Sequence, residues 1–487
     1  MAPFLAMQNK PIPLAGTNTS LGIHREVNQP TAEFAEGIPS TRSESVFVDY
    51  KPAFNRLQAV NEANRCLFCT DAPCIQACPT GIDIPQFIRK IATGNLEGSA
   101  RTIFMSNILG MTCSRVCPVE TLCVGACVYN AKDEPPIQIG KLQRYATDAA
   151  YQAGTRFFHA GPDSGKKVAL IGAGPASLAA AHRLRMEGHA VTVFEQRSVI
   201  GGLNTTGIAP HKLRADMSIE EANWVLQIGG IEVKTGITVG KDITLEALEA
   251  QFDAVFVGVG LGADTKLGVE GEGSANIHGA VEFIEQFKLG TVDVSQTKHC
   301  VVIGGGNTAL DAVREARTLG IKKVTLLYRG VESKMTGYVH EWESAKVESV
   351  GAEWQAQPVG FEVAEASDPS TTGKVTHIRC LRLDDAKKPI AGSEFLVPAD
   401  LVLVAIGQST LGQMLSGLDG IRVEKGRVIA DDHGFTGRAK WYVGGDCRNG
   451  GKEVVNAVAE GDAAARAMHA AMQAAMQAAM ISGGSNG

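Results

Sequence analysis

Lys167-Val-Ala-Leu-Ile-Gly-Ala-Gly-Pro-Ala176 is the stretch that decides the fold of this 487-residue chain. It predicts a buried strand, a glycine turn and a helix in that order, which is the opening of a dinucleotide-binding βαβ unit. In such a unit, backbone N–H groups at the helix N-terminus receive a pyrophosphate. The second strand ends in Glu195, a carboxylate suited to both ribose hydroxyls of an adenosine. We therefore expect a parallel α/β domain.

Two further motifs favour FAD as the bound dinucleotide. Gly201-Gly-Leu203 follows Glu195 by six residues, as in flavoproteins. Near the C-terminus, Trp441-Tyr-Val-Gly-Gly-Asp446 is similar to the strand-end motif whose aspartate binds the ribityl chain or pyrophosphate of a flavin. The FAD domain should therefore end close to the C-terminus of the chain.

A second fingerprint of the same build, Cys300-Val-Val-Ile-Gly-Gly-Gly-Asn-Thr-Ala309, lies about 130 residues further along. Its partner strand ends in Arg329, where the first ends in Glu195. A guanidinium suits the 2′-phosphate of NADP(H) and does not chelate a diol, and Lys334 offers a second cation. The pattern favours NADP(H) over NAD(H), while the alternative that Arg329 only ends a surface strand stays open. Val402–Gly407 is similar to the strand that returns the chain to the FAD domain.

Eight of the eleven cysteines fall in two runs ahead of these units. The first is Cys66-Leu-Phe-Cys-Thr-Asp-Ala-Pro-Cys-Ile-Gln-Ala-Cys-Pro79, and the second extends from Cys113 to Cys127. Three close thiolates and a Cys-Pro step that reaches the other cluster are typical of two-cluster ferredoxins. On this template, one cluster takes Cys66, Cys69 and Cys74 with Cys127 crossing back, and the other takes Cys78, Cys117 and Cys123. Structural zinc is the alternative, and a disulfide framework is disfavoured in a long chain without a leader.

The composition excludes several classes of function. The net charge of −6 and the absence of a basic block argue against a nucleic-acid partner. No apolar run has the roughly eighteen residues of a membrane span, and the N-terminus does not fit a signal peptide, so we expect a cytosolic protein. Three histidines are isolated in the sequence and indicate no catalytic constellation: His182, His211 and His340. A disulfide reductase is excluded because the cysteines of the nucleotide-binding part are unpaired in sequence: Cys300, Cys380 and Cys447.

The predicted fold is α/β, with a helical iron–sulfur domain ahead of two Rossmann-like domains and the NADP domain inserted in the FAD domain. The predicted boundaries are 1–45 for an extended N-terminal arm, 46–160 for a helical domain with two 4Fe–4S clusters, 161–266 and 409–480 for the FAD domain, and 267–408 for the NAD(P)H domain. Helices are expected at 84–94 and 140–151. A last helix from Ala463 aligns Met468, Met472, Met476 and Met480 on one face, which favours a packing stripe over a metal site. Residues 482–487 should be disordered.

From about Asn64 to Asp462 the sequence resembles the N-terminal half of dihydropyrimidine dehydrogenase and its bacterial flavin–iron–sulfur subunit, with the glutamate synthase small subunit as a more distant relative. The stretches that carry the resemblance are Cys66 to Thr80, Leu122-Cys-Val-Gly-Ala-Cys127 and Pro136-Ile-Gln-Ile-Gly-Lys-Leu-Gln143. The resemblance implies one cluster on Cys66, Cys69, Cys74 and Cys127, and another on Cys78, Cys117, Cys123 and Gln143. Cys113 is a rival for the eighth position because thiolate is the better iron ligand.

The resemblance also implies the nucleotide-binding residues. Together with the motifs, it assigns to FAD Val116, Gly172, Ala173, Gly174, Pro175, Ala176, Glu195, Gly202, Leu203, Lys212, Val239, Gly445 and Asp446. It assigns to the nicotinamide nucleotide Gly304, Gly306, Asn307, Thr308, Arg329, Lys334, Ala405, Ile406 and Gly407. Lys212 stands where the family has arginine, and no arginine matches a second phosphate contact near Thr336, so the choice between NADP and NAD stays open.

The resemblance implies an electron-input subunit. Hydride would pass from NAD(P)H to FAD, and single electrons would then pass through two 4Fe–4S clusters to a partner. The FMN-binding half of the full-length relatives is absent, so we expect a hetero-oligomer with an FMN/iron–sulfur catalytic subunit that reduces uracil or thymine. A glutamate synthase small subunit, a ferredoxin–NADP oxidoreductase and a non-enzymatic redox-sensing module are the alternatives. Gln143 and Asp71-Ala-Pro-Cys74 favour the pyrimidine branch.

Overall fold

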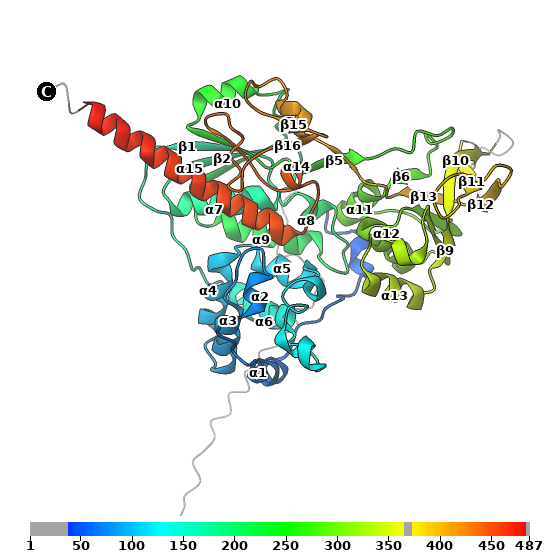
Figure 1. Ribbon diagram of the computed structural model, residues 1–487, viewed down its shortest axis with the longest axis horizontal. Coiled ribbons are helices and arrows are strands. Elements are labelled where there is room, and N and C mark those ends of the chain that lie inside the picture. Colours follow the sequence, from blue (N-terminus) through cyan, green and yellow to red (C-terminus); the bar gives the residue numbers. More distant parts are fainter. Residues whose placement is uncertain (1–37, 365–372, 484–487) are drawn as a thin grey trace, which may run out of the picture.

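The computed structural model describes residues 38–364 and 373–483. Most of the predicted arm at 1–45 and the end of the segment predicted to be disordered, 484–487, lie outside these residues. Figure 1 shows three lobes, which are a helical lobe in blue and cyan and two lobes that each contain a sheet. We call them the cysteine domain, the first sheet domain and the second sheet domain. The predicted fold class is confirmed, while the predicted boundaries stay predictions.

The cysteine domain consists of short helices around an apolar core. Asp83 begins one of them by accepting a hydrogen bond from the Gln86 amide at 3.1 Å, with proline in the first turn. Phe87, Ile88 and Leu142 are fully buried at the centre. The helices are α1 (Arg56–Asn64), α2 (Pro73–Gln76), α3 (Ile84–Ala92), α4 (Leu96–Ser106), α5 (Gly110–Val116) and α6 (Ile139–Gln152). The two helices expected at 84–94 and 140–151 are therefore confirmed as α3 and α6.

The first sheet has the order β17-β4-β1-β2-β3, and all its pairs are parallel. Its strands are β1 (Lys167–Ile171), β2 (Ala190–Glu195), β3 (Ile231–Thr235), β4 (Ala254–Val257) and β17 (Trp441–Val443). The central strands are apolar and buried, as strands covered on both faces are. The helices of this domain include α7 (Pro175–Met186), α8 (Leu203–Thr206), α9 (Ala215–Leu226), α10 (Leu245–Gln251) and α14 (Asp446–Asn449). Because β17 follows the second sheet domain in sequence, that domain is an insertion.

The second sheet has the order β6-β13-β7-β8-β9 and is also parallel. Its strands are β6 (Ile277–Gly279), β13 (Leu401–Val404), β7 (His299–Ile303), β8 (Lys323–Tyr328) and β9 (Gly351–Trp354). Its helices are α11 (Ala280–Leu289), α12 (Asn307–Thr318) and α13 (Val339–Val347). An antiparallel sheet adjoins it, made of β10 (Ala356–Val363), β11 (Val375–Arg382) and β12 (Phe395–Pro398).

Residues 402–407, predicted to return the chain to the first sheet domain, contain most of the last strand of the second sheet and the segment that leaves it. Leu401–Val404 is an internal strand of the second sheet, between β6 and β7. The chain then pairs as β14 (Gln408–Thr410) with the outgoing β5 (Leu261–Asp264) in an antiparallel ribbon. A short hairpin of β15 (Val423–Glu424) and β16 (Arg427–Val428) follows. An apolar run of four residues fits any buried strand, and only pairing with distant strands decides its place.

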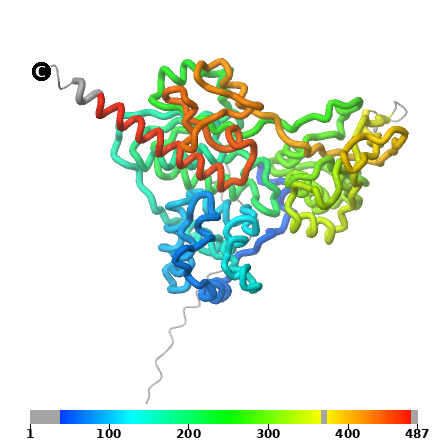
Figure 2. Tube along the Cα trace, in the orientation of Figure 1, coloured from blue at the N-terminus to red at the C-terminus, as the bar shows by residue number. Residues whose placement is uncertain are grey.

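The last helix, α15 (Val454–Gly483), begins nine residues before the predicted start at Ala463. It packs along α7, where Met468 and Met472 are buried in the core of the first sheet domain. The predicted packing stripe is confirmed for these two residues, and Met476 is half-buried. Figure 2 shows the far end of α15 projecting from the lobe. Within residues 38–364 and 373–483, every helix is too short or too polar to span a lipid bilayer.

Residues 42–54, which we call the strap, run from the second sheet domain to the cysteine domain (dark blue in Figure 1). At its start, the Ser43 amide donates to the Gly290 carbonyl at 2.9 Å. The Phe47 ring then stacks on Phe287 of α11 with centroids 5.6 Å apart. Towards its end, Arg144 of α6 forms an ion pair with Asp49. The strap thus joins two lobes that are far apart in sequence.

Candidate redox site

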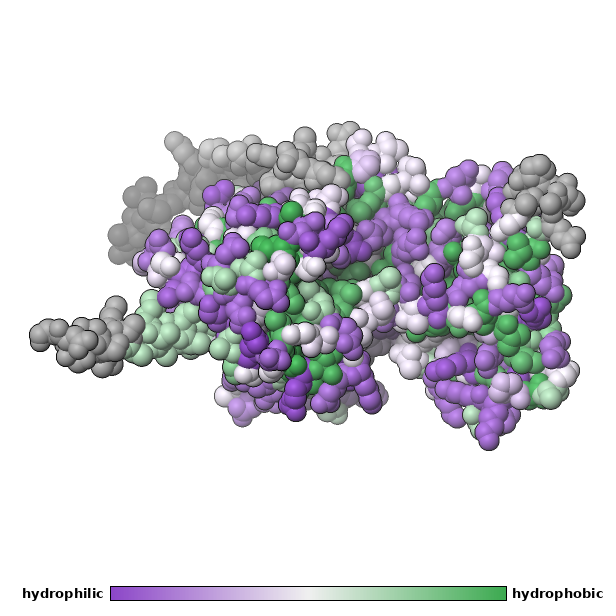
Figure 3. All heavy atoms as spheres, turned by 90° about the horizontal axis from the view of Figure 1, so that it is seen from above, coloured by the Kyte–Doolittle hydropathy of each residue, from purple (hydrophilic) through white to green (hydrophobic). Residues whose placement is uncertain are grey.

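A cavity of about 1040 Å³ lies where the three lobes meet. It is formed by the carboxyl ends of β1, β2 and β4, by the loop after β17, and by parts of the strap, α5, α12 and α13. Figure 3 shows the furrow between the lobes of the two sheet domains from above. The carboxyl end of a parallel sheet is the edge at which open α/β folds bind ligands. The cavity volume is large for a small-molecule site and suits an extended cofactor.

The glycine turn after β1 forms one wall of the cavity. Gly172 has φ +91°, and a Cβ atom there would lie 2.7 Å from the carbonyl oxygen of Gly258. Only glycine fits this position, because both the backbone conformation and the space exclude a side chain. Helix α7 begins three residues later with Pro175, so its first amides lie beside the turn. The turn can therefore approach a pyrophosphate closely.

Glu195 at the end of β2 is held by the backbone. One of its carboxylate oxygens accepts from the Ala173 amide at 2.7 Å, and the other accepts from the Arg197 amide at 2.8 Å. The residue is buried, yet it borders the cavity. A carboxylate has about four acceptor positions, so it can still receive ribose hydroxyls. Asp446 borders the cavity at the start of α14, and burial raises the pKa of its carboxyl group.

All thirteen residues predicted for FAD line this single cavity: Val116, Gly172, Ala173, Gly174, Pro175, Ala176, Glu195, Gly202, Leu203, Lys212, Val239, Gly445 and Asp446. Of the residues predicted for the nicotinamide nucleotide, all of which the structure describes, Asn307 alone lines it. The others lie elsewhere on the second sheet domain. The cavity also contains residues that the sequence did not single out, including Tyr50, Lys51, Asp311, Tyr338 and Glu341.

Lys212 joins the two sheet domains inside the cavity. Its Nζ lies 2.7 Å from Oδ1 of Asp311 on α12 and 2.6 Å from Oε1 of Glu341 on α13. These two carboxylates raise the pKa of Lys212 and outweigh its burial, so the side chain stays cationic. The second oxygen of Glu341 is buried without a hydrogen-bond partner among the described residues. Lys212, one of the residues predicted for FAD, thus lines the cavity and also pairs with the neighbouring domain.

The second fingerprint has the same glycine turn as the first, but the cations after its second strand are exposed to solvent. Gly304 has φ +151°, and a Cβ atom there would lie 2.4 Å from the Ala405 carbonyl oxygen. Asn307 begins α12, and its Oδ1 accepts from the Tyr338 amide at 3.0 Å. Arg329, at the end of β8, is exposed, as is Lys334 in the following turn. These cations stand where the second sheet presents its carboxyl edge to solvent.

The first cysteine group lines one small hollow and consists of Cys66, Cys69, Cys74 and Cys127. The rest of the hollow is mainly apolar, and Leu67 at its rim is 49% exposed. Burial raises the pKa of the Cys74 thiol to about 11, so binding of a metal cluster would have to displace its proton. Within the described ranges, no three His, Cys, Asp or Glu side chains are arranged to hold a single metal ion. Four cysteines match the donor set of a cuboidal cluster, which takes one thiolate on each iron.

The second cysteine group lies next to the cavity and consists of Cys78, Cys117 and Cys123, with Cys113 beside Cys117. Cys113 and Cys117 are buried and pack together with Cys78. The pKa of Cys117 is raised, first by its hydrogen bond with Cys113 and then by burial, and burial raises that of Cys123 to about 12. Val116, Cys117 and Pro118 line the cavity, so this group reaches the cavity through Cys117 at the end of α5.

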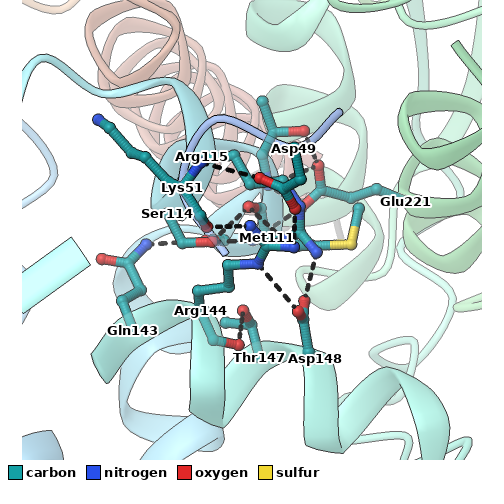
Figure 4. Close-up of polar contacts among 12 residues, drawn as sticks. Asp49, Lys51, Met111, Ser114, Arg115, Gln143, Arg144, Thr147, Asp148 and Glu221 are labelled. Carbon is teal, nitrogen blue, oxygen red and sulfur yellow. Dashed lines mark hydrogen bonds and ion pairs between the residues drawn. The ribbon is translucent and has the colours of Figure 1, made fainter. Parts of the chain in front are cut away.

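Gln143 lies on α6 beside the start of α5. Its Nε2 donates to the Gly110 carbonyl at 2.8 Å. Figure 4 shows the amide nitrogen directed at α5 and the oxygen turned away from the polar network around it. The oxygen is thus left as a candidate iron ligand, while Cys113 is the neighbour of Cys117. The structure keeps both candidates for the eighth position.

A buried polar network holds α5 in place (Figure 4). Arg115 donates to Asp148 on α6 at 2.7 Å, and Arg144 also pairs with Asp148. At the other end, Glu221 of α9 accepts the amides of Met111 and Thr112 and the Thr112 hydroxyl. Burial raises the pKa of Glu221 to about 7 despite these donors. The helix between the cysteines and the cavity is thereby fixed to two domains.

Two known families match separate parts of the chain. The family described as pyridine nucleotide-disulphide oxidoreductase matches residues 166–461. The chain belongs to this family. The family described as dihydropyrimidine dehydrogenase domain II, 4Fe-4S cluster, matches residues 42–155. These matches confirm the predicted cofactor classes, which are a 4Fe–4S cluster, FAD and a nicotinamide nucleotide, and they define the chain as an oxidoreductase.

Two curated relatives cover most of the chain. The glutamate synthase [NADPH] small chain of Escherichia coli K12 is 35% identical over 445 residues, which are 86% of this chain and 92% of the relative. The NAD-dependent dihydropyrimidine dehydrogenase subunit PreT of the same strain is 34% identical over 419 residues, with 86% and 95% covered. The predicted resemblance is confirmed, but the prediction that glutamate synthase is the more distant relative is wrong, because the two relatives are 35% and 34% identical to this chain. The chain is an NAD(P)H-dependent flavin/iron–sulfur oxidoreductase subunit.

Solved structures agree with the fold of the two sheet domains. Mycobacterium tuberculosis FprA in complex with NADPH is 20% identical, with a TM-score of 0.51 over 64% of this chain and 86% of that one. Thioredoxin reductase of T. acidophilum is 20% identical, with a TM-score of 0.50 over 63% and 99%. Cys300, Cys380 and Cys447 are buried and free in this chain. The three thus form no disulfide.

Proposed function

We propose that this chain is the electron-input subunit of a dihydropyrimidine dehydrogenase. In this proposal, NAD(P)H is oxidised at the cavity, and electrons leave through two 4Fe–4S clusters to a separate FMN/iron–sulfur subunit that reduces uracil or thymine. The observation that carries the proposal is the position of Cys117, which borders the cavity and packs with Cys78 and Cys113. A cytosolic location is part of the proposal, because free thiols and clusters suit a reducing compartment.

The residues of the cavity have distinct roles in this proposal. FAD, when bound, supplies the conversion of a hydride into single electrons. Glu195 and the amides beside Gly172 would hold its adenosine and pyrophosphate, because they form a fixed acceptor and a donor cradle. Asp446 would bind the ribityl or pyrophosphate region. Lys212 would keep the second sheet domain against the cavity through its two ion pairs.

The glutamate synthase small chain is the second candidate, because that relative is as similar as PreT. The two candidates differ in the partner. Purified protein with flavin and iron should oxidise NAD(P)H with an artificial dye in both cases. Addition of an FMN/iron–sulfur pyrimidine-reducing subunit should make this oxidation depend on uracil. Copurification with a glutaminase-containing subunit, and no uracil-dependent oxidation, would refute the first candidate.

The proposed ligands can be tested separately. If Gln143 is the eighth ligand, Gln143→Leu should lower the iron and sulfide content towards one cluster per chain, while Cys113→Ala should leave it unchanged. The reverse result would assign the position to Cys113. Anaerobic preparation and iron and sulfide analysis provide the measurement, and flavin content serves as the control for folding.

A further inference from the structure

Lys51 of the strap reaches the boundary between the cavity and the second cysteine group. Its Nζ donates to the carbonyl oxygen of Cys117 at 3.2 Å. Both Lys51 and Cys117 line the cavity. No motif in the sequence marks this lysine, and it comes from a segment more than sixty positions away, as the separation of 66 between the two residues shows.

The main chain at Lys51 is held by contacts of Lys51 itself and of the preceding residue, Tyr50. The amide of its neighbour Tyr50 donates to the His211 carbonyl at 2.8 Å, and the guanidinium of Arg314 stands over the Tyr50 ring at 5.1 Å. The Lys51 carbonyl accepts from Arg144, and its amide donates to Asp49 at 2.9 Å. These contacts hold the main chain, so only the side chain is left to reach Cys117.

The ammonium group of Lys51 is separate from the neighbouring carboxylates. Figure 4 shows its side chain extending away from Asp49 and from the Arg115–Asp148 pair. In the part of the chain that the structure describes, Nζ forms a hydrogen bond to a carbonyl and lies 5.9 Å from the Tyr50 ring centroid, and no ion pair is formed. A positive charge is thus placed beside Cys117 without a partner that cancels it.

We propose that Lys51 raises the reduction potential of the second cluster and so favours the transfer of electrons out of the cavity. This inference rests on the proposed function. A cluster becomes more negative when it is reduced, and a nearby cation stabilises that state, most strongly where water is excluded. The hydrogen bond to a carbonyl of a ligand residue acts in the same direction. The step is the transfer of one electron, in which the flavin is oxidised, the cluster is reduced and no bond forms or breaks.

Lys51→Met in the anaerobic, fully loaded protein tests this inference. It keeps the length of the side chain and removes the charge. At a fixed potential, we expect the ratio of reduced to oxidised second cluster to fall roughly tenfold. A mediated redox titration followed by electron paramagnetic resonance measures the ratio, with the second cluster identified as the signal that Cys117→Ser removes. Lys51→Arg should stay within about twofold of the wild type, because the cation is kept.

Lys141→Met is the matched control. Lys141 is a half-buried lysine of the same domain whose Nζ stands 5.3 Å from the Phe54 ring centroid at the end of the strap. It should titrate like the wild type. An unchanged potential in Lys51→Met, or an equal shift in Lys141→Met, would overturn the inference. The titration uses chemical mediators, so it remains informative even if NAD(P)H fails to reduce the flavin, which would instead refute the proposed function.

Discussion

The two parallel sheets share one plan and are attached to the molecule in different ways. The first sheet is covered by α7 and α15, and Glu221 ties its α9 to the cysteine domain. The second sheet is joined through the β5–β14 ribbon, the strap and the ion pairs of Lys212. The first therefore forms the floor of the cavity, and the second contributes one wall and an open edge. The same βαβ unit can thus form an enclosed nucleotide site, as in the first sheet, or an exposed one, as in the second.

The largest expected difference between the sheets lies in their glycine turns. Gly172→Ala should reduce the flavin content of the purified protein at least tenfold, because its Cβ would meet the Gly258 carbonyl at 2.7 Å in a left-handed backbone conformation. Gly304→Ala is equally strained and should spare the flavin while it raises the KM for NAD(P)H. Absorbance after denaturation measures the flavin.

Gly417→Ala is the control, because the space around that residue is open and its φ is not positive. A Gly172→Ala protein with a full complement of flavin would show that the Gly172 turn is not the one that binds flavin. Equal flavin loss in Gly304→Ala would lead to the same conclusion.

The attachment of the second sheet can be broken at Lys212. Lys212→Met leaves Asp311 and Glu341 facing each other in a buried site, which should destabilise the protein by about 3 kcal/mol. Chemical denaturation of the flavin-loaded protein measures this. Lys346→Met removes exposed pairs with Glu332 and Glu343, and it should cost much less stability, because water and salt screen exposed ion pairs. Equal losses in both variants would mean that Lys212 does not join the domains.

The attachment of the first sheet should depend on pH through Glu221. Its pKa rises from the ordinary 4.5 to about 7 in the folded protein, so the neutral acid is favoured by folding. The stabilisation is complete below pH 4.5 and is lost as the pH rises to about 7, with a total of about 3 kcal/mol. Glu221→Gln should flatten this part of the pH profile of stability. A profile that Glu221→Gln leaves unchanged would contradict the assignment.

The sequence could indicate which residues of the first sheet domain line the cavity, because several of them stand at fixed points of a local motif. Gly172 and Glu195 end neighbouring parallel strands, so their approach follows from topology alone. Tyr50, Asp311 and Glu341 could not be predicted, because they reach the cavity through packing between domains and carry no motif. The internal position of Leu401–Val404 in the second sheet could not be predicted either, because its pairing with β6 and β7 is not local.

The smallest expected effect concerns the open edge of the second sheet. Arg329 directly follows β8, close to the place that Glu195 has at the end of β2, and it is exposed. If it receives a 2′-phosphate, Arg329→Ala should raise the KM for NADPH roughly tenfold and leave that for NADH within twofold, because an exposed charge-assisted hydrogen bond contributes about 1.5 kcal/mol. Lys323→Ala, which removes an exposed cation at the other end of the strand, is the control.

Initial rates with a dye acceptor measure the KM values for NADPH and NADH. A wild-type preference for NADH, or an unchanged KM for NADPH in Arg329→Ala, would mean that the two strand ends do not select nucleotides by the same rule.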